Sequence, residues 1–203
     1  MEQNLTAQMT ALLSHTFFGP VQWYQKLHRY PEVLIEQHDS YQKQTYRNRC
    51  LIATTGGIQA LTVPVADGMR ISDHGNWRHQ HWQALQSAYG DSPFFLYYED
   101  DLRPFFTERW ETLYDYDEAI RLKMCELIDI QPVVRPTDHY LCGPELSGID
   151  DFREAICPKH PQADPQFEPR PYYQVYRQKH GFLPNLSILD LLLNMGPESI
   201  FYL

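Results

Sequence analysis

The residues best suited to chemistry lie in the segment 73–82, which holds three of the nine histidines and two of the four tryptophans. Histidine can give or take a proton near neutrality because its unperturbed pKa is about 6.5, and a neighbouring tryptophan shifts that pKa by excluding water. If a helix begins at Trp77, a turn of about 100° per residue brings His81 and Leu85 onto the same inward face. We therefore predict His81 as a catalytic base beside Trp77.

Two other interpretations of this segment stay open. His81 can instead be a core histidine whose ring is hydrogen-bonded to a backbone carbonyl. A metal site would need His79 and His81 on one side, which requires an extended segment because a helix separates them by roughly 160°. A helix is expected here, so no metal ligand is predicted.

The second candidate site is the basic segment 43–49, Lys-Gln-Thr-Tyr-Arg-Asn-Arg. In an extended conformation Lys43, Arg47 and Arg49 share one face, which gathers positive charge in an acidic chain. Such a face suits a phosphate or carboxylate of an activated donor, and we predict that these residues bind substrate. The alternative is salt bridges to some of the 26 acidic residues. Asn48 would point the opposite way, where a turn or backbone role is expected, although it too is a substrate-binding candidate.

Composition narrows the function classes. The chain has 203 residues, a formal net charge of −9 and a pI near 5.4. A nucleic-acid binder needs a basic face, so no nucleic-acid partner is expected. The first ten residues lack the pattern of a signal peptide, and no apolar run reaches about 18 residues. A cytoplasmic protein without a membrane span is the expectation.

No cofactor is predicted. The four cysteines are widely spaced without a CxxC pair, which gives no support for a zinc ribbon or a redox motif. Reduced thiols packed as small hydrophobic groups are expected, although one of them could act as a nucleophile. No GxGxxG or P-loop motif is present, so dinucleotide binding and Walker-type ATP hydrolysis are not expected.

Apolar patterning predicts helices and strands that are intermingled along the chain. Helices are expected at 21–27, 77–89, 117–130 and after Ser187, strands at 32–36, 50–54 and 58–65, and a hairpin turn at Gly56-Gly57. The apolar stretch 12–18 leads to a break at Gly19-Pro20 and carries no strand prediction. The segment 158–171 holds five prolines, which predict a surface loop that serves as a lid or binding loop or is disordered.

Ser187 and Asp190 match a capping box, in which a hydroxyl and a carboxylate three residues apart satisfy free N–H groups at a helix start. A hydrolase triad of these residues with a histidine is disfavoured because no G-x-S-x-G elbow is present. For the fold, we predict a mixed α/β or α+β structure: a single domain over residues 1–203 with a partly antiparallel sheet packed by helices. The strand order is not predicted.

Three segments resemble the WbqC-like protein family. They are 43–49, then Trp77 to His81 with Tyr89 and 93–95 downstream, and 182–192, Phe-Leu-Pro-Asn-Leu-Ser-Ile-Leu-Asp-Leu-Leu. The family often begins with a Q-P-Y-F-F-P turn. The corresponding stretch here, 14–20, reads Ser-His-Thr-Phe-Phe-Gly-Pro, so the role of that glutamine is not transferred.

The resemblance supports Trp77 and His81 as the catalytic pair and implies His15, Tyr89 and Asn185 as further substrate-binding residues. Members of the family occur in gene clusters for O-antigen and other surface polysaccharides, and transfer of glycine or another small acyl group to a sugar has been suggested. A bacterial transferase that uses an activated sugar or acyl donor is therefore implied. The alternative is a non-catalytic binding or scaffold protein that docks another enzyme of the same pathway.

Overall fold

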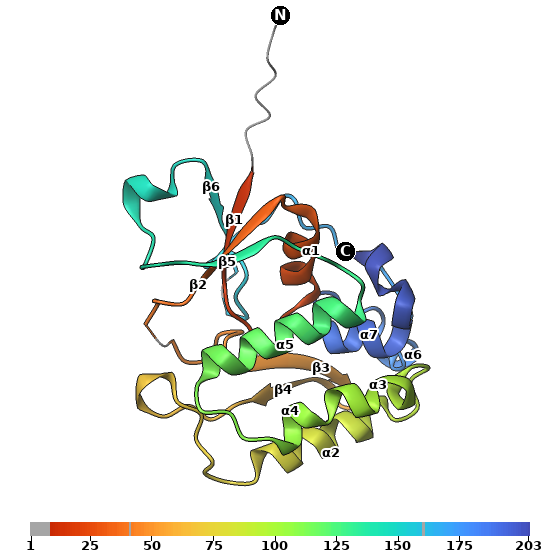
Figure 1. Ribbon diagram of the computed structural model, residues 1–203. Coiled ribbons are helices and arrows are strands. Elements are labelled where there is room, and N and C mark those ends of the chain that lie inside the picture. Colours follow the sequence, from red (N-terminus) through yellow and green to blue (C-terminus); the bar gives the residue numbers. More distant parts are fainter. Residues whose placement is uncertain (1–8, 41, 160) are drawn as a thin grey trace, which may run out of the picture.

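A four-stranded parallel sheet forms the centre of the fold in the computed structural model, which describes residues 9–40, 42–159 and 161–203 (Figure 1). Its strands lie in the order β5-β2-β1-β6. They are β1 (Thr10–Ser14), β2 (Glu32–Glu36), β5 (Val134–Pro136) and β6 (Ile149–Asp151). The three apolar residues of β1, Ala11 to Leu13, are fully buried, as is typical of a strand covered on both faces. In the register, Leu12 pairs with Leu34 on one side and with Asp151 on the other.

The predicted hairpin forms a separate two-stranded antiparallel sheet. It consists of β3 (Arg49–Thr54) and β4 (Gly57–Thr62), with Thr54 paired to Gly57 across the turn. Gly57 has a φ of 107°, a conformation that favours glycine. The mixed fold class is thus confirmed, although the central sheet itself is entirely parallel.

Helices surround both sheets (Figure 1). They are α1 (Val21–Arg29), α2 (Trp77–Tyr89), α3 (Phe95–Leu102), α4 (Pro104–Thr107), α5 (Leu113–Leu127), α6 (Arg177–His180) and α7 (Ile188–Met195). Short 3₁₀ helices lie at Asp67–Met69, Gly143–Leu146 and Gly196–Tyr202. The helices expected at 21–27, 77–89, 117–130 and after Ser187 are confirmed. The third of them, α5, begins at Leu113 rather than Asp117, because Thr112 caps it by accepting a hydrogen bond from Asp115 N. None of the described helices is long and apolar enough to cross a membrane.

Three strands of the central sheet, β1, β5 and β6, carry no strand prediction. A run that is buried on both faces does not alternate, so its periodicity cannot distinguish a strand from a buried helix. The edge strands β5 and β6 have three residues each and contain proline or aspartates, which are depleted in strands. One continuous hydrophobic core includes residues from Ala11 to Leu203. This core supports the single-domain assignment, which stays a prediction.

The helix α7 is buried from Ile188 to Asn194, as its leucines predict. The hydroxyl of Ser187 caps it by accepting a hydrogen bond from Leu189 N. The capping-box role of Asp190 is wrong, however. Its carboxylate instead accepts hydrogen bonds from the hydroxyls of Tyr89 and Tyr172 and from the amide of Gln174, at 2.7–2.8 Å. A buried carboxylate needs such donors, and these come from segments distant in sequence.

The proline-rich segment 158–171 has no helix or strand among its described residues, as predicted. It is attached to α1 by a buried ion pair between Lys26 Nζ and Asp164, at 2.8 Å, and by a hydrogen bond from Gln22. Burial works to raise the pKa of Asp164, but the hydrogen bonds from Lys26 and Gln22 hold it below its usual value. Packing against α1 therefore fixes the middle of this loop.

Replacing Gly196 by alanine is expected to destabilise the fold by about 1–3 kcal/mol. Gly196 ends α7 with a φ of 55°, and a Cβ there would lie 2.5 Å from ring carbons of Phe94. Urea denaturation measures the loss. Gly56→Ala in the hairpin turn is the control, because its Cβ would meet nothing closer than Thr54 Oγ1 at 3.8 Å. Equal stability of the two variants would contradict this role of Gly196.

Candidate functional site

The direction in which the chain adds strands to the central sheet reverses at β1. The chain proceeds outward from β1 to β2 and β5, and then returns to place β6 on the other side of β1. In open parallel sheets, ligands bind in the crevice at the carboxyl ends of the strands on either side of such a reversal. The fold alone therefore directs attention to the residues that follow β1 and β6.

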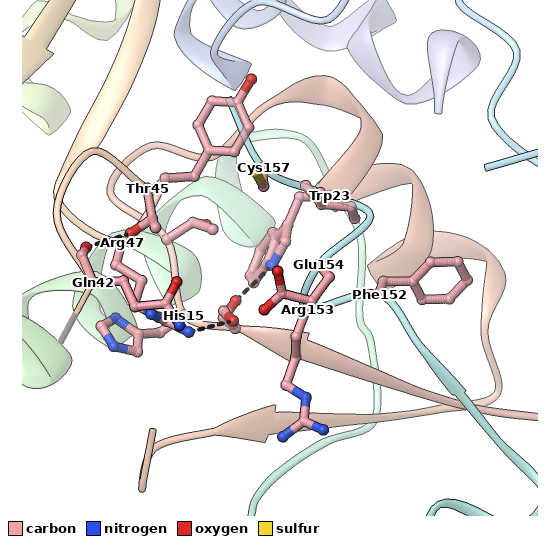
Figure 2. Close-up of a pocket in the computed structure, with 13 residues that line it drawn as sticks. His15, Trp23, Gln42, Thr45, Arg47, Phe152, Arg153, Glu154 and Cys157 are labelled. Atoms are coloured by element: carbon pink, nitrogen blue, oxygen red, sulfur yellow. Dashed lines mark hydrogen bonds between the residues drawn. The ribbon is translucent and has the colours of Figure 1, made fainter. Parts of the chain in front are cut away.

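A pocket lies at this position (Figure 2). It is lined by the end of β1 and the residues after it, 14–16, and by residues after β6 between 152 and 157. The other lining residues are Trp23, Gln42, Thr45, Tyr46 and Arg47. Its cavity volume is about 30 Å³, room for about two waters or one group of carboxylate size. Figure 2 shows His15 and Arg47 on one side, whereas the side chains of Arg153 and Phe152 point away from them.

His15 is bonded to a carboxyl group from α5. Its Nδ1 lies 2.5 Å from Oδ2 of Asp117, and both side chains are almost wholly buried. Tyr114, also on α5, packs edge-on against the imidazole with ring centroids 5.6 Å apart. His15 Nε2 makes no hydrogen bond with the described residues. One ring nitrogen is thus held by Asp117, and the other is left for a further partner.

Burial sets the protonation of this pair. It lowers the pKa of His15 to about 3, helped by the positive charge of Arg47. It raises the pKa of Asp117 well above its usual value, against the opposing effect of Arg47. An imidazolium ion is therefore disfavoured, and a proton gained or lost here belongs to the His15–Asp117 pair rather than to either residue.

Arg47 brings a buried guanidinium group to the same pocket. Its Nη2 contacts the carboxylate of Asp39 and donates to Ser14 Oγ at 3.1 Å. Its Nε and Nη1 have no hydrogen-bond partner among the described residues, and neither does the buried hydroxyl of Thr16. Buried donors without partners are costly, by about 1–3 kcal/mol each. They are enclosed in the wall of the pocket with almost no accessible surface, so a bound group pairs with them after a small shift of the side chains.

The opposite wall is held by a different set of charges. Arg153 donates to Glu36 Oε2 at 3.1 Å and also pairs with Asp151. The carboxylate of Glu36, at the end of β2, is fully buried and also accepts a hydrogen bond from Thr137, which follows β5. These bonds join the carboxyl ends of β2, β5 and β6, so Arg153 has a structural role in the wall.

The predicted basic face of 43–49 does not form. The segment turns rather than extends, with Gln44 at a φ of 65°, and only Arg49 belongs to a strand. Lys43 is exposed and Arg49 bonds Thr62 Oγ1, so neither lines the pocket. Asn48 donates to the Val63 carbonyl at 2.9 Å, the backbone role that was expected. The acid that pairs with Arg47 is Asp39, and the substrate-binding roles of Lys43, Asn48 and Arg49 stay predictions.

The structure places His81 and Trp77 in the core rather than at the pocket. Both are buried on the inward face of α2, as the helical phasing predicts, with ring centroids 5.2 Å apart, while His79 is exposed. Burial lowers the pKa of His81 to about 4 and outweighs the opposing effect of the Thr62 backbone, and its Nδ1 has no hydrogen-bond partner among the described residues. This geometry matches the core-histidine interpretation, and catalysis by His81 stays an untested prediction.

Tyr89 and Asn185 make bonds that hold the fold together. Tyr89 is fully buried, and its hydroxyl donates to Asp190 and accepts from Ala53 N. Asn185 binds the start of α1, where its side chain accepts from Gln22 N and donates to Gln22 Oε1. Neither residue lines the pocket. Of the predicted substrate-binding residues, the structure brings only His15 and Arg47 together there.

Several residues that line the pocket or lie behind it were not predicted from sequence. Asp117 was expected only as the start of a helix, and nothing in its local sequence pairs it with His15. Trp23 donates from its indole nitrogen to the Ser14 carbonyl at 2.9 Å. Cys157, one of the free thiols, also lines the pocket. The sequence signal that could have pointed to this pocket is the position of His15 just after the apolar run 11–13. Among the described residues, no three His, Cys, Asp or Glu side chains lie close enough to hold a metal ion.

Replacing His81 by phenylalanine should reduce the loss of stability in acid. The unfolded chain takes up a proton at this site near pH 6.5, but the folded chain does so only near pH 4. The stabilisation present above pH 6.5 is therefore lost as the pH falls towards 4, by about 3 kcal/mol for this group. Urea denaturation at pH 7 and pH 4.5 measures it. His79→Gln, on the exposed side of α2, should behave as wild type, and the same pH dependence in His81→Phe would refute the assignment.

One comparison with known proteins identifies a family. The model of the WbqC-like protein family matches residues 16–159, a range that includes Arg47, Asp117 and the pocket wall after β6. "Uncharacterized protein Rv1507c" of Mycobacterium tuberculosis is 27% identical over 201 residues, covering 85% of this chain and 87% of that protein. No solved structure matches this chain. Since the family match covers more than half of its length, the chain belongs to the WbqC-like protein family.

Proposed function

We propose that this chain is a cytoplasmic transferase of surface polysaccharide biosynthesis, which moves glycine or another small acyl group from an activated donor onto a sugar intermediate. The observation that carries the proposal is the buried His15–Asp117 pair, 2.5 Å apart, in the pocket beside β1. Acyl transfer needs a group that takes a proton from the attacking hydroxyl or amine and returns it to the leaving group. The transfer of a small acyl group to a sugar that has been suggested for the family supports this choice of substrate class.

In this proposal the His15 ring works through its two nitrogens. As the sugar hydroxyl or amine attacks the acyl carbon, its proton moves to Nε2, and the proton on Nδ1 moves towards Asp117. The raised pKa of Asp117 favours that shift, and the lowered pKa of His15 disfavours an imidazolium ion. The bond between the acyl carbon and the leaving group of the donor then breaks, Nε2 returns the proton to that leaving group, and Nδ1 takes its own proton back from Asp117. Asp117 orients the ring, as the acid of a catalytic triad does.

A developing oxyanion needs a hydrogen-bond donor. We assign that role to Thr16, a residue that lines the pocket next to His15 and whose buried hydroxyl has no partner among the described residues. His81 has no role in this scheme, because it does not line the pocket and is buried on the inward face of α2.

A non-catalytic docking role is the second candidate. Two large apolar side chains on α3, Leu96 and Tyr97, are 79% and 72% exposed. A shallow and mostly apolar groove includes the two residues that precede α3. It is lined by Pro93, Phe94, Tyr173, Asn194, Met195, Pro197 and Glu198. Exposed aromatic and aliphatic groups of this kind are found where partner proteins bind. In this case the chain would recruit another enzyme of the pathway.

The transferase predicts that His15→Gln abolishes the acyl modification of the polysaccharide while the protein stays folded. A deletion strain is complemented with wild type, His15→Gln or His81→Gln, and the mass of the polysaccharide repeat is measured. We expect the modification with His81→Gln, provided its protein level is normal, and none with His15→Gln. An unchanged repeat with His15→Gln would contradict catalysis. If Leu96→Asp with Tyr97→Asp then removed the modification, the docking role would replace it.

A further inference from the structure

We infer that the inner end of the pocket recognises a single carboxylate group on the ligand, and that Arg47 is the residue that selects it. This inference rests on the proposed function, because it names the chemistry of a substrate at the same site. The inference concerns only the part of the ligand that enters the cavity. The transfer step itself is unchanged.

The guanidinium group of Arg47 is held ready for an acceptor. The side chain is only 5% exposed, and its Nη2 is fixed by Asp39 and Ser14. The donors on Nε and Nη1 make no hydrogen bond with the described residues. A charged donor in this state gains most from an ionised acceptor, since such hydrogen bonds are roughly twice as strong as neutral ones.

The size of the cavity limits what can reach this guanidinium. Its volume of about 30 Å³ admits a group of two or three heavy atoms, because one water needs about 10–15 Å³ on this measure. A sugar ring or a nucleotide does not fit inside and would have to lie at the mouth. The buried part of the ligand is therefore a small polar end group.

The charges around the cavity favour one negative charge over several. Arg47 is already balanced by Asp39, and Glu154, an exposed acid, also lines the pocket. A phosphate dianion or diphosphate would be repelled by both carboxylates. A carboxylate brings one charge and two acceptor oxygens. It can belong to an acidic sugar or to an acyl unit that carries a second carboxyl group, because the carboxyl that is transferred is not a free carboxylate in the activated donor.

Binding to the full chain tests the inference by ligand-detected NMR, with acetate, glucuronate, glucose and inorganic phosphate as probes. Acetate represents a carboxylate without a sugar ring, glucuronate an acidic sugar, and glucose the matched neutral sugar. We expect at least one carboxylate to bind, and glucose and phosphate to bind at least about tenfold more weakly than that carboxylate. Tighter binding of glucuronate assigns the group to the sugar, and tighter binding of acetate assigns it to a carboxylate outside a sugar ring, such as the second carboxyl group of an acyl unit.

The decisive variant is the double substitution Arg47→Gln with Asp39→Asn, which removes both partners and leaves no unpaired buried charge. Carboxylate binding should fall at least about tenfold, with the fold checked by circular dichroism. Lys43→Gln is the matched control, because it removes a positive charge from the same segment outside the pocket. The inference is overturned if wild type binds no carboxylate, if phosphate binds equally well, or if the double variant binds like Lys43→Gln.

This test and that of the proposed function can fail separately. His15→Gln should still bind the carboxylate, since Arg47 supplies the charged contact. If no carboxylate binds but His15→Gln abolishes the polysaccharide modification, the inference alone is wrong. If carboxylate binding depends on Arg47 but His15→Gln leaves the modification unchanged, the catalytic function alone is wrong.

Discussion

The contact between His15 and Asp117 is the constraint on which the rest of the site depends. It joins the end of β1 to α5 across 102 residues of sequence, and neither group could be buried without the other except at a large cost. To deliver Asp117, the whole segment between β2 and β5 has to fold back over the carboxyl end of the sheet. Phe17 contributes to this closure: its ring packs on Tyr116, and its N–H donates to the Tyr46 carbonyl. The same contacts bring Arg47 to the pocket.

The buried acids that hold the fold together differ from the residues at the site in how completely their polar atoms are hydrogen-bonded. Both carboxylate oxygens of Glu36, Asp164 and Asp190 are bonded to described donors, which is how a fold stabilises buried charge. At the pocket, Arg47 and Thr16 keep polar atoms without described partners, and so does Asp117 directly behind it. Such atoms also occur in the core, for example on Gln25 and Trp82. At the carboxyl end of β1 they combine with a cavity and a buried imidazole.

Local patterns in the sequence predict the elements that local interactions form. The inward face of α2, the hairpin β3–β4 and the burial of α7 all follow from spacing and turn residues. These patterns do not predict a strand that is buried on both faces, such as β1. They also do not predict a short edge strand that contains acidic residues, such as β6. It also misassigns Asp190, because Tyr89 and Tyr172 approach from distant segments. His81 attracts attention through its neighbours in sequence, whereas the partner of His15 is 102 residues away and only the fold reveals it.

Nitrogen NMR of histidine side chains in ¹⁵N-histidine-labelled protein tests the His15–Asp117 contact most directly. We expect a His15 ring that stays neutral from pH 5 to pH 8, because burial lowers its pKa to about 3. Its Nδ1 signal should report a strong hydrogen bond that is lost in Asp117→Asn, and His15→Gln assigns the signals. A His15 ring that titrates near pH 6.5 and does not respond to Asp117→Asn would contradict the buried pair and the site built on it.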